Sequence, residues 1–255
     1  MQFDEKWSFV GKKEKHVDPA DPADPADARK GDNWDHVAYD PEHRLVLCTV
    51  PGKRSAEKVG ELVADVKRRL GGRVPRLVTT DEFAPYKRAV LDAWGVDVEP
   101  PRTGKPGRPR KARRQPHPDL CYATVHKTRE KGRVVSVATA VVFGAVAAVT
   151  AALAASTCST HVNTSFIERH NGTDRNRNAR KTRKTYCFSK DWLTHEAVGY
   201  FTMYSYNFCW PVRTLALKPD DGTQVPRTPA MAAGLADHVW SLAEWLAMPT
   251  VQHSA

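Results

Sequence analysis

One uncharged stretch constrains the fold of this chain more than any other. Val134–Ala155 (VVSVATAVVFGAVAAVTAALAA) runs for 22 residues without a charge, which is long enough to cross a lipid bilayer. Its two halves differ, however, because the first is rich in β-branched residues and ends at Gly144, whereas the second is rich in alanine. We therefore predict a buried strand followed by a short helix, and no membrane-spanning segment.

The periodicity of the rest of the chain predicts alternating strands and helices. Phe3–Gly11 alternates apolar and polar side chains, so that Asp4 and Glu5 would face opposite sides of a strand. The further elements expected are strands at Asp35–Asp40, Leu45–Val50, Arg76–Thr80 and Val96–Glu99, a hairpin of Cys121–Lys127 and Val134–Phe143, and helices at Ser55–Leu70, Phe83–Trp94, Ser189–Asn207 and Ala230–Ala247.

Two segments have compositions that cannot pack into a core. The loop at residues 14–33 contains DPA three times in succession, and Pro100–Pro118 holds six prolines and seven basic residues, typical of a mobile basic arm. The predicted organisation is therefore the first part of an α/β domain (1–99), an insertion of the arm and the hairpin (100–145), the second part of the domain (146–215) and a C-terminal extension with one helix (216–255).

The overall charge favours a polyanionic partner. Lys plus Arg number 39 against 29 acids, a net charge of +10, which suits nucleic acid. The five cysteines are odd in number, widely spaced and without a C-x-x-C pair, which argues against disulfides and against a cysteine zinc site. A reducing cytoplasm fits this usage, and the N-terminus shows no signal-peptide pattern.

A dense basic run follows Glu168 within Asn163–Tyr186, with Asp174 as the only other acid. Two interpretations of Glu168 stay open. It can complete a capping box with Ser165 and merely close the start of a helix, or it can be a metal ligand beside a polyanion. The candidate DNA contacts are Arg169, His170, Asn171, Arg175, Arg177, Arg180, Lys181, Arg183 and Lys184 in this stretch, and Arg108, Arg110, Arg113 and Arg114 in the arm.

Three acids lie on or next to the predicted elements: Asp4 is on the first strand, Asp81 directly follows the fourth strand, and Glu168 is on a late helix. This order resembles the ribonuclease-H-like fold, a mixed sheet flanked by helices. Cleavage of a phosphodiester by two metal ions needs hard divalent cations about 3.5–4 Å apart, and Mg²⁺ prefers carboxylate and water oxygens. We expect the three acids to hold two Mg²⁺ ions, for which Mn²⁺ can substitute. Asp40 is the alternative first ligand, although an Asp-Pro pair also starts turns.

The residues around these acids carry a family resemblance. DEKWSFVGKKEK at Asp4, TTDEFAPY around Asp81 and NTSFIERHN around Glu168 resemble bacterial insertion-sequence transposases of the insertion-sequence-one type. RKTYCFSKDW and YNFCWPVRTL resemble the C-terminal part of the same family. The resemblance implies a DDE transposase with Asp4, Asp81 and Glu168 as catalytic metal ligands. Such an enzyme nicks element ends and transfers the freed 3′-hydroxyl strand into target DNA without a covalent protein intermediate.

The resemblance also implies partners and a setting. Two element ends must be paired, so we expect a homodimer or larger assembly on transposon-end and target DNA, in the bacterial cytoplasm and at the nucleoid. Family members carry an N-terminal DNA-binding region ahead of the first acid. Two alternatives are open here: an upstream reading frame encodes this region and frameshifting joins it to the chain, or the region is lost. The alternatives are a truncated relative that regulates transposition by binding DNA without turnover, and a stand-alone metal-dependent nuclease.

Overall fold

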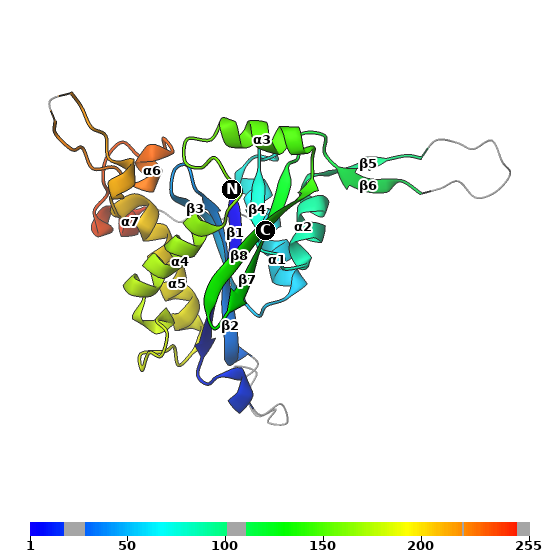
Figure 1. Cartoon of the computed structure of the whole chain (residues 1–255). Coiled ribbons are helices and arrows are strands. Elements are labelled where there is room, and N and C mark those ends of the chain that lie inside the picture. Colours follow the sequence, from blue (N-terminus) through cyan, green and yellow to red (C-terminus); the bar gives the residue numbers. More distant parts are fainter. Residues whose placement is uncertain (18–28, 101–110, 221, 249–255) are drawn as a thin grey trace. The chain divides into compact units, whose positions relative to one another are not determined.

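A six-stranded mixed sheet organises the structure (Figure 1). The computed structural model describes residues 1–17, 29–100, 111–220 and 222–248. The strand order is β3-β2-β1-β4-β7-β8. The strands are β1 (Gln2–Val10), β2 (Gly31–Asp40), β3 (Leu45–Gly52), β4 (Val78–Thr80), β7 (Tyr122–Glu130) and β8 (Arg133–Phe143). Strands β1 and β7 both pair in parallel with β4, and β8 is antiparallel to β7. Strands β2 and β3 are joined by only residues 41–44, a connection so short that it requires antiparallel neighbours.

Two amphipathic helices bury the core of this sheet, as the sequence predicts. Helix α1 (Ala56–Arg69) begins at Ser55, whose Oγ accepts a hydrogen bond from the backbone N–H of Lys58 at 3.3 Å. Helix α2 (Pro85–Trp94) packs beside it. Their apolar stripes join a core with Phe3 of β1, which stacks on Tyr86 of α2 at a ring-centroid distance of 5.6 Å.

The remaining elements are short strands and helices. Strands β5 (Gly95–Val98) and β6 (Arg113–Pro116) pair in a separate antiparallel ribbon that projects from the sheet (Figure 1). The other helices are α3 (Val146–Ala154), α4 (Ser165–Arg177), α5 (Trp192–Cys209), α6 (Pro229–Ala232) and α7 (Leu242–Ala247), with 3-10 turns at Glu14–His16, Ala179–Lys181 and Arg213–Leu215.

The uncharged stretch forms a strand and then a helix, as predicted. Strand β8 ends before Gly144, whose φ of +86° suits glycine, and α3 follows. No helix within the described ranges combines the length and the apolar character that crossing a lipid bilayer requires. The expected burial of the strand is wrong, because residues 133–141 are exposed. Strand β8 lies at the edge of the sheet, where β7 is its only neighbour among the described strands.

Two further expectations differ from the structure. The hairpin assigned to an insertion contributes β7 and β8 to the main sheet, because β7 pairs with β4. The single helix expected at Ala230–Ala247 is two short helices, α6 and α7, since the chain turns at Gly234 with φ +71° and starts again at Ser241, which forms a capping box with Glu244. The DPA repeat, residues 18–26, lies outside the described residues.

The chain divides into two compact units. Unit 1 comprises Met1–Trp7, Asn33–Tyr39 and Leu47–His170, and unit 2 comprises Ser8–Asp32, Asp40–Val46 and Asn171–Ala255. In unit 2 the buried ring of His195 on α5 lies between two hydroxyls, with Nδ1 3.0 Å from Ser189 Oγ and Nε2 3.5 Å from Ser8 Oγ. These polar contacts fasten α5 within unit 2.

Candidate metal centre

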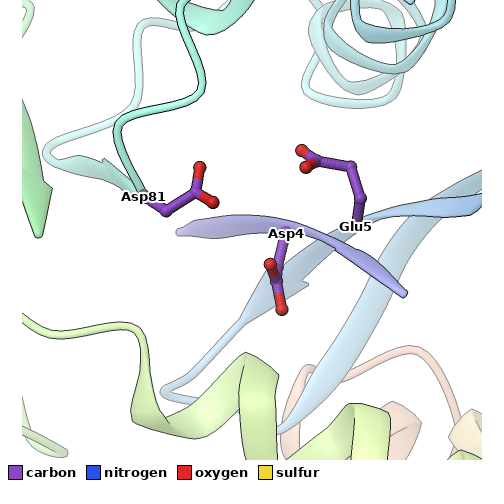
Figure 2. A group of neighbouring side chains, drawn as sticks. All are labelled: Asp4, Glu5 and Asp81. Carbon is purple, nitrogen blue, oxygen red and sulfur yellow. The ribbon is translucent and has the colours of Figure 1, made fainter. Parts of the chain in front are cut away.

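An acidic cluster forms where β1 and β4 run side by side in unit 1. Asp4 and Glu5 leave opposite faces of β1, and Asp81 turns its carboxylate towards the strand from the loop after β4 (Figure 2). Each of the three offers a carboxylate oxygen within 4.8 Å of the others. The backbone N–H of Phe83 donates to Asp81 Oδ1 at 3.0 Å, which orients that side chain. The parallel register of β1 and β4 therefore brings together acids that are far apart in the sequence.

The electrostatics of Asp4 reflect this crowding. Its pKa is raised from 3.8 to about 7, first because the carboxyl is buried and then because Glu5, Asp81 and Glu168 repel its negative charge. A carboxyl with such a pKa retains its proton at mildly acidic pH, and a cation placed among these oxygens would favour its ionised form.

Glu168 approaches the cluster from α4, so the three acids predicted from the sequence lie in one region of unit 1. Its charge raises the pKa of Asp4, but it is not among the three residues whose oxygens lie within 4.8 Å of one another. Its Oε1 accepts a hydrogen bond from Thr164 Oγ1 at 2.6 Å and is paired with the ammonium group of Lys127 on β7. In this conformation Lys127 supplies the counter-charge of Glu168.

The capping-box interpretation of Glu168 is wrong. Ser165 is the first residue of α4 rather than its cap, and its backbone N–H and its hydroxyl both donate to Asn163 Oδ1, at 3.1 and 2.8 Å. A second N-terminal amide, that of Ile167, donates to Gln2 Oε1 at 2.9 Å. Asn163 and Gln2 therefore accept hydrogen bonds from backbone N–H groups at the start of α4. The Glu168 carboxylate does not cap the helix and instead interacts with Lys127 and with the charge of Asp4.

Glu5 and Arg54 belong to the cluster although the sequence analysis did not select them. The Glu5 side chain is only 2% exposed, and its Oε2 accepts hydrogen bonds from Nε and Nη2 of Arg54 at 3.1 and 3.0 Å. The same guanidinium lies 3.9 Å from Asp81 Oδ2 and 4.0 Å from the centroid of the Phe83 ring. Glu5 was not selected because strict alternation along β1 places it on the face opposite Asp4. The sequence feature that could have indicated Glu5 is the pair of consecutive acids at residues 4 and 5.

The residues of this cluster fit a hard divalent cation. Carboxylate oxygens are the ligands that Mg²⁺ and Mn²⁺ prefer. Glu5 Oε1 and Tyr86 Oη are both buried beside these ligands, and a hydrogen bond between the two side chains affects the pKa of each. Burial raises the pKa of Tyr86 well above its usual range, and the carboxylates of Glu5, Asp4 and Asp81 raise it further, so the hydroxyl keeps its proton.

Asp40, the alternative first ligand, lies in unit 2 and serves a turn. Its Oδ1 accepts from the backbone N–H of Glu42 at 2.9 Å, and its Oδ2 lies 2.5 Å from Nδ1 of His43. These bonds are those expected of an Asp-Pro pair that starts a turn. Asp4, not Asp40, is therefore the first-strand acid of the cluster.

Three of the predicted DNA contacts on α4 and after it are buried instead. His170, Asn171 and Lys181 are only 4%, 4% and 3% exposed, and the His170 ring stacks on Tyr39 at 4.9 Å. Buried side chains cannot reach a phosphate backbone, so these three predictions are corrected. Exposed side chains remain at Arg169, Arg177, Arg183 and Lys184, whereas Arg175 and Arg180 are half-buried.

The predicted contacts of the basic arm have mixed outcomes. Arg114 donates to Asp97 Oδ2 at 3.0 Å and to the backbone oxygen of Asp92 at 2.9 Å, which ties β6 to β5 and α2 rather than leaving it open to DNA. Arg113 is exposed. Arg108 and Arg110 lie outside the described residues.

Comparison of the chain with protein-family models, with curated proteins and with solved structures finds no match.

Proposed function

We propose that this protein is a DDE-type DNA transposase that cuts and joins phosphodiesters with two divalent ions, Mg²⁺ or Mn²⁺. The observation that carries the proposal is the convergence of Asp4, Asp81 and Glu168. They come from β1, from the end of β4 and from α4, and the charges of the latter two both raise the pKa of Asp4. Arg54 and Lys127 already pair with Glu5, Asp81 and Glu168, and a bound divalent cation would add positive charge beside Asp4.

The topology supports the same proposal. The order β3-β2-β1-β4-β7, with helices after β3 and β4, supports a ribonuclease-H-like sheet to which β8 adds a sixth strand at the edge. That fold carries its acids on the first strand, after the fourth strand and on a late helix, which are the positions of Asp4, Asp81 and Glu168. The resemblance of the three surrounding motifs to insertion-sequence-one transposases selects transposition among the reactions that the fold supports.

In such a reaction the residues of the cluster would have distinct roles. Bound divalent cations would activate the attacking oxygen and stabilise the leaving oxygen of the phosphodiester. Asp4 and Asp81 hold carboxylates at the meeting point of two strands, and the N–H of Phe83 keeps Asp81 in position. Lys127 neutralises Glu168 and orients it. Arg169, exposed and adjacent to Glu168, lies where it could contact a DNA phosphate.

A strand-transfer assay tests the proposal. The substrates are oligonucleotides that carry a free 3′-hydroxyl and copy the terminal sequences of the element on either side of the coding region. They are incubated with the full chain, a target plasmid and Mg²⁺ or Mn²⁺. We expect joined products, and we expect Asp81→Asn and Glu168→Gln to reduce joining to background. Asp92→Asn is the matched control, because Asp92 is an exposed acid of α2 that pairs with Arg88.

Each other outcome contradicts the proposal in a different way. Cutting without joining would indicate a metal-dependent nuclease, and binding without turnover would indicate a regulator. Full joining by Glu168→Gln would show that the site is assigned to the wrong residues. As a transposase the protein would act in the bacterial cytoplasm, on element ends and target DNA, as a homodimer or larger assembly.

A further inference from the structure

Strand β8 presents an open, apolar edge. It is 11 residues long and ends the strand order, so that one side of its backbone has no partner among the described strands. Residues 134–143 carry no charge, and Val134, Val135 and Val137 are 44%, 53% and 56% exposed. The pairing of β8 with β7 shifts register near both ends of β8, so its regular edge is the stretch Ser136–Val141. Natural proteins usually shield an edge with charges, prolines, bulges or a covering segment, because it pairs readily with another strand, and this central stretch holds no charge and no proline.

The opposite edge of the sheet shows how this protein shields an edge. Strand β3 is mostly buried, and Asn207 of α5 satisfies the backbone of Val46 from both sides. Its Oδ1 accepts from the Val46 N–H at 3.0 Å, and its Nδ2 donates to the Val46 oxygen at 2.9 Å. No comparable side chain bonds to β8 among the described residues. Among the described residues, the edge at β8 is therefore more open than the edge at β3.

We propose that β8 pairs with β8 of a second copy of this chain, joining two sheets into one. A partner strand can satisfy the whole row of N–H and C=O groups along an edge, and an uncharged strand suits the valines, alanines and threonine beside them. Strand β8 meets both conditions itself, which makes it complementary to its own copy across a two-fold axis. The inference does not depend on the proposed transposase activity.

Charge selects the antiparallel arrangement. Two copies that each carry +10 repel one another, so they approach most easily where the chain has no charge. Antiparallel pairing centred on Ala138, the midpoint of β8, places Arg133 of each copy opposite the uncharged Phe143 end of the other. Parallel pairing would place the two Arg133 side chains, and the basic turn at Lys131, against each other.

The neighbouring helix extends the apolar surface. Helix α3 follows β8 after Gly144, and its Val146 is 69% exposed. The exposed apolar surface therefore continues past the end of the strand.

Sedimentation velocity over a range of protein concentrations tests this inference on the full chain without DNA or metal. We expect a dimer for the unaltered protein and a monomer for Val135→Lys/Val137→Lys, with dimer dissociation at least about 100-fold easier, since two charges would enter an apolar contact on each side. The control is Leu193→Lys/Leu246→Lys, which adds the same charge at side chains that are 71% and 66% exposed in unit 2. It should remain dimeric.

Hydrogen exchange then locates the contact. Amides of residues 134–142 should exchange more slowly as the protein concentration rises, and those of β3 should not change. A cooperative thermal unfolding transition shows that the β8 variant still folds, which its exposed positions favour. A monomer at every concentration, a dimer that survives the β8 lysines, or protection of β8 only on phosphatidylcholine vesicles would each overturn the proposal.

Discussion

Neutralising Asp4 should stabilise the protein in the absence of metal, and the gain should depend on pH. The pKa of Asp4 is 3.8 in an ordinary environment and about 7 in the folded chain, because the group is buried and lies beside Glu5, Asp81 and Glu168. As the pH rises, the unfolded state therefore loses the proton first. The contribution of Asp4 to the free energy of unfolding is therefore fully present below pH 4, falls between about pH 4 and 7, and is constant above pH 7.

The magnitude follows from the size of the shift. Each pKa unit corresponds to about 1.4 kcal/mol, so the ionised Asp4 lowers the free energy of unfolding by about 4 kcal/mol above pH 7. At pH 5 the same reasoning leaves less than about 2 kcal/mol. Asp4→Asn keeps the shape of the side chain and removes the charge. We therefore expect its advantage over the unaltered protein to grow by about 2–3 kcal/mol between pH 5 and pH 8.

Urea denaturation in EDTA at both pH values measures this difference. Added Mg²⁺ should restore stability to the unaltered protein at pH 8 and have little effect on Asp4→Asn, because the cation replaces the missing positive charge. Asp92→Asn is the control, since it removes only a surface ion pair worth under about 1 kcal/mol. An advantage of Asp4→Asn that is equal at pH 5 and pH 8, or a loss of stability at pH 8, would refute the reasoning.

Three other substitutions should separate the roles of neighbouring residues. Arg54→Gln should tighten Mn²⁺ binding in calorimetry by removing a competing cation, and should cost the metal-free protein about 1–3 kcal/mol in urea because buried Glu5 loses its partner; unchanged binding would show that Arg54 does not compete with metal. Asp40→Asn should leave Mn²⁺ affinity unaltered in the same titration, since Asp40 bonds within a turn, and a clear loss would return it to the site. Asn207→Ala should cost about 1–3 kcal/mol in urea denaturation, because it leaves both backbone groups of Val46 unpaired, and a neutral effect would mean that water replaces the amide.

Local pattern was enough to predict most elements and the ends of several. Ser55 caps α1 as its position before an apolar stripe indicates, and the change of period at Gly144 marks the boundary of β8 and α3. Asp4 and Asp81 could be selected because each stands on or directly after a predicted strand. All these features depend on neighbours within a few residues, which a single sequence displays directly.

Burial and pairing were decided only by the tertiary structure. The apolar composition of β8 predicts a core strand, yet its place at the edge of the sheet leaves it exposed. His170 and Lys181 lie in a basic run that suggests a surface, yet both are buried. The contact between Glu5 and Arg54 joins residues 49 positions apart. Such outcomes depend on which distant segment packs against a residue, and hydrophobic periodicity carries no information about that partner.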